Sequence, residues 1–342
     1  MTAVLDLLDD VRDQIEPNDD ALSEARERLA FVRTKAGSFY GVLRTYRSGS
    51  LATHTMNTPV TDGDGGVVLN RNFYPGLGPE GTGAEAPAEV VNDLIAHIGP
   101  LVRETYPDAK IHKSKRGPKI HFHAPLIDGT DPTVDLVVAL TRKEGDGLWI
   151  PDLEDDGWEA SDPERHIVLF NGAATAFRST RRKVMRLAKA WNKQFSEPGA
   201  SSFEMSVWAY EFVEPGMGVA KGLWAVFDGA ASRLEAEEPT PDPVEVSPDL
   251  RLLIDSQTMA ARLRKAADYM QAAIAATEDD DVREALSGVF FKYIEAPFSA
   301  SLAASAKLLK SPKPVEATAL GVAVVGTTTG ASLARAYGGP VR

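Results

Sequence analysis

Three aspartates have the residue type and the spacing to hold divalent metal ions. Asp62 and Asp64 are two residues apart, and Asp135 stands alone far downstream. Side chains two apart on an extended strand point to the same side, so the first two carboxylates would share one face. Mg²⁺ prefers carboxylate and phosphate oxygens, and two such ions can clamp the attacking and leaving oxygens of an in-line displacement. The sequence therefore predicts that these three residues are catalytic and bind two Mg²⁺ ions, which Mn²⁺ could replace.

Each part of this pattern also has a simpler interpretation. The stretch 61–66 contains three glycines and is equally typical of a polar loop. Asp135 lies in the nearly continuous apolar run 134–140, as expected of a buried strand. An unpaired carboxylate is costly to bury, so its partner would be either a metal ion or an arginine in a salt bridge. As a metal ligand, Asp135 could also activate an incoming ribose hydroxyl.

A glycine–serine pair precedes the two close aspartates. Ser50 follows Gly49 and lies twelve residues before Asp62. Glycine lets the backbone approach a phosphate closely, and serine adds a hydroxyl donor. The pair alone is a weak signal, but together with the aspartates it predicts a contact to nucleotide phosphates.

Composition and charge limit the partners and the compartment. The chain has 342 residues, of which 43% are hydrophobic and 25% charged, and we expect two globular domains. The 37 basic and 49 acidic residues give a net charge of −12, so no extended nucleic acid is expected as a partner. The absence of cysteine excludes disulfides, thiolate metal sites and a cysteine nucleophile. No signal peptide and no apolar run of membrane-spanning length are found, which predicts a cytoplasmic protein without a membrane partner.

Hydrophobic periodicity and turn residues predict the elements that must position these side chains. The expected helices are 21–46 (with a break allowed at Gly41), 87–105, 178–195, 204–212, 250–277 and 281–309, and the expected strands are 62–69, 119–126 and 133–140. A mobile loop is expected at 71–88, an acidic connection at 149–163 and a solvated loop at 235–248.

Taken together, the motifs resemble those of the polymerase-β-like nucleotidyltransferases. The matching segments are Gly49-Ser50, Thr-Met-Asn-Thr-Pro at 55–59, Asp62-Gly63-Asp64, Val-Asp-Leu-Val at 134–137, and the stretches 150–152, 158–163 and 182–192. More narrowly, the chain is similar to the cGAS/DncV-like nucleotidyltransferases (CD-NTases) of bacterial antiphage signalling, over roughly residues 20–310. The segment 55–59 is most similar to their DncV branch, which makes cyclic dinucleotides.

This resemblance implies an α+β fold with a polymerase-β-like core, a mixed sheet with helices, followed by a helical C-terminal domain. Residues 1–180 would be the catalytic core with N-terminal helices. Residues 181–311 would be a helical domain that forms the other wall of a nucleotide cleft, and residues 312–342 a flexible tail of small residues. The family usually has an aliphatic or polar residue where this chain has Gly63, which puts the fine metal geometry in doubt.

The resemblance also implies a function and a set of site residues. The function is Mg²⁺-dependent synthesis of a cyclic di- or oligonucleotide second messenger from NTPs, ATP or GTP foremost, in antiphage (CBASS) signalling. The residues implied are Asp62 and Asp64 as ligands of both ions, Asp135 as the ligand that completes the metal site, Gly49 and Ser50 at the donor phosphates, and Lys189 and Arg182 at the triphosphate. Two alternatives stay open: transfer of a nucleotide to a tRNA end or a protein, and a silent nucleotide sensor. The acidic charge argues against tRNA, and three intact aspartates argue against a silent sensor.

Other residues give weaker signals. His121 and His123 are two apart on an expected strand and would be either metal ligands or a polar hairpin face. The basic stretch 112–119 is either a phosphate-contacting lip or a solvated hairpin. The basic residues of 181–189 either bind the triphosphate or balance acidic neighbours on a helix surface.

The end of the chain contains a diglycine, Gly338-Gly339, in a small-residue tail. In some relatives a ubiquitin-activating-like enzyme joins the C-terminus to other molecules, and trimming after Gly339 would expose a suitable glycine carboxylate. The alternative is an ordinary disordered tail.

Overall fold

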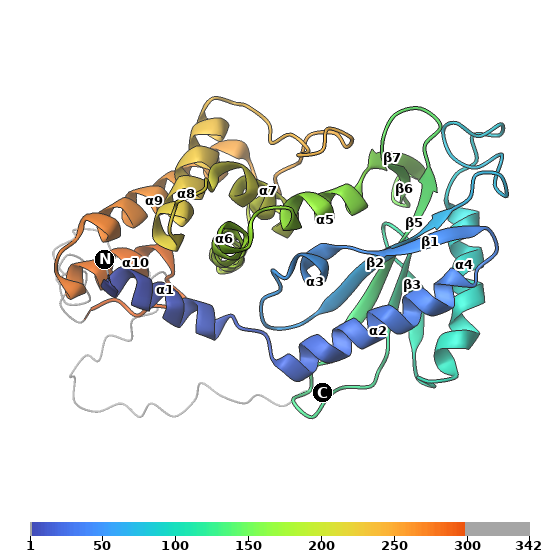
Figure 1. The fold of residues 1–342 in the computed structure, drawn as a ribbon, viewed down its shortest axis with the longest axis horizontal. Coiled ribbons are helices and arrows are strands. Elements are labelled where there is room, and N and C mark those ends of the chain that lie inside the picture. The colour runs from blue at the N-terminus through green and yellow to red at the C-terminus, as the bar shows by residue number, and fades with distance from the viewer. Residues whose placement is uncertain (1, 298–342) are drawn as a thin grey trace, which may run out of the picture. The chain divides into compact units, whose positions relative to one another are not determined.

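The computed structural model describes residues 2–297, and within that range a seven-stranded mixed sheet carries the three aspartates (Figure 1). The strands are β1 (Val42–Arg47), β2 (Asp62–Leu69), β3 (Lys110–Lys113), β4 (Pro118–His121), β5 (Thr133–Thr141), β6 (Leu148–Asp152) and β7 (Gly157–Ser161). Their order is β1-β2-β5-β4-β3, while β6 pairs with both β5 and β7. The pair β2–β5 is parallel, and the other described pairs are antiparallel. The strands expected at 62–69 and 133–140 are therefore confirmed.

Helices α2 (Asp19–Gly37) and α4 (Ala88–Arg103) pack their apolar sides against this sheet. Helix α2 begins after Asn18, whose side-chain oxygen accepts hydrogen bonds from the backbone N–H groups of Asp20 and Ala21 at 2.8 and 3.2 Å. Where α2 crosses β2, a Cβ added at Gly63 would lie 3.2 Å from Leu29 Cβ. Glycine between the two aspartates thus lets the helix approach the side of β2 opposite to the carboxylates.

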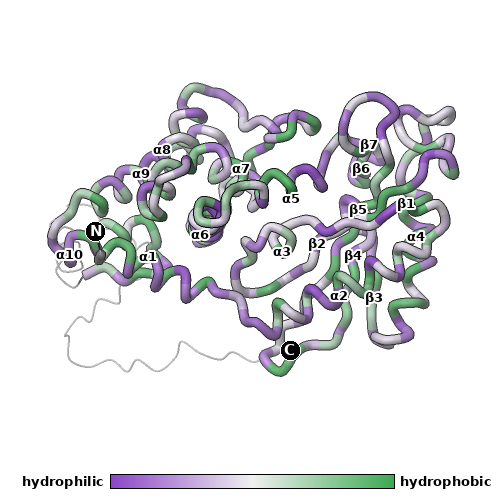
Figure 2. Tube along the Cα trace, in the orientation of Figure 1, coloured by the Kyte–Doolittle hydropathy of each residue, from purple (hydrophilic) through white to green (hydrophobic). Residues whose placement is uncertain are grey.

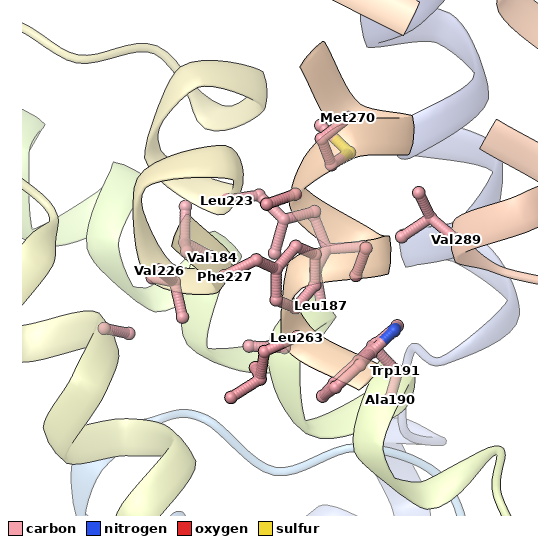
Figure 3. Packing of buried hydrophobic residues seen from close by; sticks show 14 of the residues in the cluster. Val184, Leu187, Ala190, Trp191, Leu223, Val226, Phe227, Leu263, Met270 and Val289 are labelled. Carbon is pink, nitrogen blue, oxygen red and sulfur yellow. The ribbon is translucent and has the colours of Figure 1, made fainter. Parts of the chain in front are cut away.

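The remaining long helices build a second core. They are α1 (Thr2–Gln14), α5 (Pro163–Asn171), α6 (Thr175–Lys193), α7 (Ser202–Phe212), α8 (Val219–Glu235), α9 (Ser256–Ala275) and α10 (Asp279–Val289). Figure 3 shows Trp191 of α6 and Phe227 of α8 among the apolar side chains at its centre, and the two rings are 4.8 Å apart between centroids. Hydrophobic and hydrophilic residues alternate along these helices, as expected of amphipathic helices (Figure 2).

The expected domain bounds at 1–180, 181–311 and 312–342 stay a prediction. Helix α1 packs with the helical core rather than with the sheet, although the expected first domain at 1–180 includes it. Residues up to 297 form one compact unit. The tail at 312–342, its diglycine and the end of the helical domain beyond residue 297 lie outside the described residues. No helix within residues 2–297 has both the length and the apolar character needed to cross a membrane.

Parts of two expected elements form strands instead. The helix expected at 21–46 ends at Gly37, and residues 42–47 form β1 instead, which pairs with β2 after a turn in which Gly41 has φ = +75°. The connection expected at 149–163 is mostly the hairpin β6–β7, because Trp149 and Leu148 pair with the end of β5. Strand β1 pairs with a strand that follows only after the segment 48–61, while β5, β6 and β7 pair as neighbours along the chain.

Candidate active site

Strand register brings the three predicted carboxylates together. In the parallel pair β2–β5, Asp64 lies opposite Asp135, and Asp62 precedes Asp64 on the same side of β2. One carboxylate oxygen from each residue lies within 4.8 Å of one from each of the others. Within residues 2–297, no other three acidic or histidine side chains are grouped in this way. The three residues can therefore share a cation.

Gly49 touches Asp64 directly, and this contact requires glycine. Gly49 has φ = +65°, and an added Cβ would lie 1.8 Å from Asp64 Oδ2. The backbone N–H of Ser48 also donates a 2.9 Å hydrogen bond to the carbonyl oxygen of Asp64. The expected glycine–serine turn is the start of a short helix, α3 (Gly49–Thr53), and Ser50 lines the same cavity as Asp64. The pair is thus built against β2, the strand that carries Asp62 and Asp64.

Burial raises the pKa of Asp64 to about 7, and the charges of Asp62 and Asp135 add to that rise. Lys119 and Lys189 act in the opposite direction without offsetting it. A divalent cation would relieve this repulsion, and carboxylate oxygens are the donors that Mg²⁺ and Mn²⁺ prefer. The residues present therefore fit a divalent metal site.

Asp135 has a cationic partner that differs from the expected one. Lys119 Nζ on β4 donates a 2.6 Å hydrogen bond to Asp135 Oδ2, where the sequence suggested a metal ion or an arginine. The two residues are cross-strand neighbours in the β4–β5 register. The Asp135 side chain is 27% exposed, so the strand leaves its carboxylate accessible rather than buried. Its neighbours Val134 and Leu136 are buried, as expected of this apolar run, while Asp135 itself lies on the less buried face of β5.

A cavity of about 360 Å³ lies beside the carboxylates. Its sheet side is formed by residues of β2, α3 and the segment between them: Ser48, Gly49, Ser50, Thr53, Thr55, Met56, Asn57, Pro59, Thr61, Asp62 and Asp64. Its helix side is formed by residues of α5, α6 and α7: Pro163, His166, Ile167, Phe170, Lys189, Lys193, Ser202, Phe203 and Ser206. One wall is therefore acidic, and the facing wall combines lysines with aromatic rings.

Lys189 lies on the helix side and is buried. Its Nζ donates a 2.8 Å hydrogen bond to Thr55 Oγ1, which lies 2.8 Å from Thr53 Oγ1. Burial lowers the pKa of Lys189 to about 7, and the charge of Lys193 lowers it further, while Asp64 acts to raise it. A buried ammonium without a carboxylate hydrogen-bonded to it is suited to receive an anion from the cavity.

The other basic residues of α6 serve different contacts. Arg182 does not line the cavity, and its guanidinium donates a 2.6 Å hydrogen bond to Asn171 Oδ1. Arg186 Nε donates to Asn57 Oδ1 at 3.0 Å, and another of its nitrogens donates to Glu16 at 2.6 Å. These two arginines join α6 to neighbouring segments by hydrogen bonds. The sequence suggested that they either bind the triphosphate or balance acidic neighbours, and only the contact of Arg186 with Glu16 is of the second kind.

Sequence reasoning missed Lys119 and the aromatic part of the helix side. Helix α5 was not expected, although Asp162 caps it by accepting a hydrogen bond from the backbone N–H of Arg165, and Pro163 begins it. An aspartate followed by proline is a recognisable helix start, and Phe170 then falls on the apolar side. The proximity of Lys119 to Asp135 follows from strand pairing and has no local signal.

The histidines His121 and His123 do not form a metal-binding group with any third described ligand. The ring centroids of His112 and His121 are 5.5 Å apart, and those of His121 and His123 are 6.4 Å apart. Burial lowers the pKa of His121, and Lys119 lowers it further. The polar hairpin face is the interpretation that this geometry favours.

No protein-family model matches the sequence, and no curated protein matches it either. Solved structures do match the fold. CdnC of E. coli MS115-1, solved in a complex with HORMA-deltaN, has a TM-score of 0.61 at 16% identity, covering 84% of this chain and 96% of CdnC. The CD-NTase CdnG of Bradyrhizobium diazoefficiens, in complex with GTP, has a TM-score of 0.60 at 17% identity, covering 84% of this chain and 95% of CdnG.

DncV of Vibrio cholerae, a cyclic AMP-GMP synthase solved with nonhydrolyzable GTP, has a TM-score of 0.53 at 14% identity, covering 86% of this chain and 88% of DncV. The similarity therefore extends over most of each chain and is not confined to the DncV branch. The mixed sheet with its flanking helices, followed by C-terminal helices, is the polymerase-β-like nucleotidyltransferase fold of the cGAS/DncV-like nucleotidyltransferases.

Proposed function

We propose that this protein is a metal-dependent nucleotidyltransferase that joins NTPs into a cyclic di- or oligonucleotide. The observation that carries the proposal is one cavity with two opposed walls. Asp62 and Asp64 line one wall, beside Asp135, and the buried Lys189 lines the other. This arrangement suits a substrate that carries several negative charges and needs a divalent cation. CdnG and DncV were solved with GTP or its analogue, which supports NTPs, ATP or GTP foremost, as the substrates.

The three carboxylates would hold two Mg²⁺ or Mn²⁺ ions. When bound, the ions would neutralise phosphate charge and polarise the phosphorus that is attacked. Gly49 and Ser50 would contact the donor phosphates, since they lie against Asp64 at the cavity. Lys189 would neutralise the triphosphate. Arg182 stays a proposed second cation, which would have to exchange its hydrogen bond with Asn171 for a phosphate.

The reaction is a substitution at the α-phosphorus of one NTP. The ribose hydroxyl oxygen of a second NTP forms a bond to that phosphorus, the bond to the bridging oxygen of the β-phosphate breaks, and pyrophosphate leaves. A second substitution of the same kind closes the ring. We assign the hydroxyl proton to Asp135, because Lys119 bonds to Oδ2 and leaves Oδ1 for this contact. Positioning and charge neutralisation would supply most of the rate enhancement.

The nucleobase would lie against the aromatic part of the helix side. Phe170 and Phe203 are 6.0 Å apart between ring centroids, and Ile167 adds apolar surface to the same wall. Bases stack readily on aromatic side chains, so this wall complements the charged end of the cavity. The resemblance to the CD-NTases of bacterial antiphage signalling also leads us to place the product in that signalling (CBASS).

The proposal is tested by mass spectrometry of phosphatase-resistant products after incubation with all four NTPs and Mg²⁺. We expect a cyclic di- or oligonucleotide from the wild type and none from the double variant Asp62→Asn/Asp64→Asn. Asp128→Asn, at an exposed turn aspartate outside the group of three, is the matched control and should retain full activity. An equal yield from the double variant would refute the assignment of the carboxylates. Labelled nucleotide recovered on a protein instead would replace cyclisation by transfer to an acceptor.

A further inference from the structure

A buried histidine–carboxylate pair lies at the wall of the cavity. His166 of α5 lines the cavity and is only 7% exposed. Its Nε2 lies 2.6 Å from Oδ1 of Asp242, which is 3% exposed and lies in the segment between α8 and α9. The segment was expected to be a solvated loop, so the burial of this aspartate is unexpected from the sequence. Such a pair is costly to desolvate and calls for an explanation in terms of function or specificity.

The surroundings of Asp242 determine where the proton of this contact lies. Asp242 Oδ2 accepts hydrogen bonds from the backbone N–H groups of Val246 and Ser247 at 3.0 and 2.7 Å. Burial alone would raise the pKa of Asp242, but His166 and these N–H groups outweigh it and lower the pKa to about 2. An ionised carboxylate has no proton to donate, so the proton is on Nε2 of His166.

The imidazole ring is held in place from other directions as well. Its centroid lies 4.8 Å from that of Phe203 in an edge-to-face arrangement. The segment that carries Asp242 is anchored by Thr240, whose hydroxyl accepts a 2.9 Å hydrogen bond from Trp208 Nε1 of α7. Phe203 and Trp208 both belong to α7, so the same helix fixes the ring and the aspartate behind it.

This arrangement leaves the second ring nitrogen unused by the contacts that hold the ring. Within residues 2–297, Nδ1 of His166 has no hydrogen-bond partner. In a neutral imidazole with its proton on Nε2, Nδ1 is an acceptor. The wall around it is the aromatic and apolar surface that suits a nucleobase.

We propose that His166, as a neutral imidazole, recognises the nucleobase in this cavity through Nδ1, selecting bases whose exocyclic amino group donates to it, and that Asp242 is the residue that positions it. The assignment rests on the proposed function only in placing a nucleotide in the cavity. Bases that carry an exocyclic amino group can donate to Nδ1, and bases that lack it lose this hydrogen bond. Asp242 acts by fixing the tautomer and the ring orientation, as a carboxylate does for histidine in other sites.

The test is a binding measurement that does not require turnover. Dissociation constants are measured by calorimetry with Mg²⁺ for two matched pairs: ATP against purine riboside triphosphate, which lacks the 6-amino group, and GTP against inosine triphosphate, which lacks the 2-amino group. For at least one pair we expect the wild type to bind the amino-bearing nucleotide about tenfold more tightly, which corresponds to one hydrogen bond.

Two variants separate recognition from a purely structural role. In His166→Gln the amide NH₂ group can still donate to Asp242, while the amide oxygen beside it lies away from the position of Nδ1. The preference should therefore fall to about one while the protein stays folded. In Asp242→Asn the backbone N–H groups of Val246 and Ser247 would donate to the asparagine side-chain oxygen. The asparagine NH₂ group would therefore face His166. Nε2 then becomes an acceptor, the proton moves to Nδ1, and the preference should reverse.

Each outcome supports or refutes base recognition by His166. An unchanged preference for amino-bearing nucleotides in His166→Gln, or an unreversed preference in Asp242→Asn, would refute base recognition. The pair would then have only a structural role, joining α5 to the segment between α8 and α9. A wild type that discriminates through His166 yet makes no product would refute the proposed function and leave this inference intact. A wild type that binds none of the four nucleotides would overturn both.

Discussion

The sheet side of the cavity (the sheet wall) and its helix side (the helix wall) obtain their geometry by different means. The sheet wall places Asp64 opposite Asp135 by strand register and makes room for the site with glycine, since Gly49 touches Asp64 directly. The helix wall places Lys189 by a hydrogen bond from its ammonium group to the hydroxyl of Thr55. One wall thus depends on the backbone, and the other on individual side chains within a helical frame.

This difference predicts that the two walls fail differently. Bulk added to the sheet wall must move the backbone, because an added Cβ has no free space there. A polar group removed from the helix wall changes charge or hydrogen bonding and leaves the backbone in place. Substitutions in the sheet wall should therefore cost activity through geometry, and those in the helix wall through electrostatics.

The largest effect is expected from Gly49→Ala. The new Cβ would lie 1.8 Å from Asp64 Oδ2, and alanine is strained at φ = +65°. Moving α3 or Asp64 by the distance needed should lower kcat/KM by about a hundredfold or more. Steady-state product formation measures this, and Gly157→Ala, whose Cβ would meet only Asp155 O at 3.9 Å, is the matched control. Equal activity of both variants would contradict the contact at Gly49.

Lys189→Met should lower kcat/KM by about a hundredfold, because the triphosphate loses a buried cation. It should also change stability with a definite sign. The pKa of Lys189 falls from 10.5 to about 7 on folding, so between these values the unfolded chain binds a proton that the folded protein lacks. Wild-type stability should therefore rise with pH across that window, and the variant should lack this contribution.

Urea unfolding of wild type and Lys189→Met at about pH 7 and about pH 10 measures the difference. The variant should be the more stable protein at the lower pH, where the burial cost of the ammonium is fully present, and its advantage should shrink as the pH rises. A variant that is less stable at neutral pH would show that the ammonium is satisfied by contacts other than Thr55.

A smaller effect is expected from Lys119→Met, which removes the cation paired with Asp135. The three carboxylates then have no adjacent ammonium group, so the affinity for Mn²⁺ should rise by roughly threefold to tenfold. Calorimetric titration of Mn²⁺ measures this. In an Asp135→Asn background the same lysine substitution should have little effect, because the charge with which Lys119 pairs is gone. Equal changes in both backgrounds would mean that the lysine acts on the other aspartates.

The smallest effect is expected at the histidine face. His123→Ala removes an exposed side chain outside the cavity and should leave product formation within about twofold of the wild type. A loss of activity that added Zn²⁺ or Mn²⁺ restores would instead establish a second metal site beside β4.

The two walls also differ in how much of each could be predicted from the sequence. The aspartates, the glycine–serine pair and the strands at 62–69 and 133–140 are local patterns, and all of these residues lie where a shared site needs them. The metal role of the carboxylates and the nucleotide role of Ser50 stay predictions.

Other features depend on pairing across long stretches of sequence. Lys119 meets Asp135 only because β4 pairs with β5. Strand β1 pairs with β2, and its Val42, Thr45 and Tyr46 are residue types that favour strands, although the expected helix was extended over them. The contact between His166 and Asp242 joins residues separated by 76 positions. No spacing rule predicts such contacts, so the recognition features of the helix wall become visible only in three dimensions.

We infer that the acidic wall binds metal ions and that the helix wall binds the nucleotide they share. A crystal structure with Mn²⁺ and a nonhydrolysable ATP or GTP analogue tests it most directly, because the anomalous signal of manganese locates the ions. We predict manganese between Asp62, Asp64 and Asp135, with the triphosphate within hydrogen-bond reach of Lys189. Manganese bound elsewhere, or a triphosphate outside the cavity, would contradict this assignment of metal and nucleotide to the two walls.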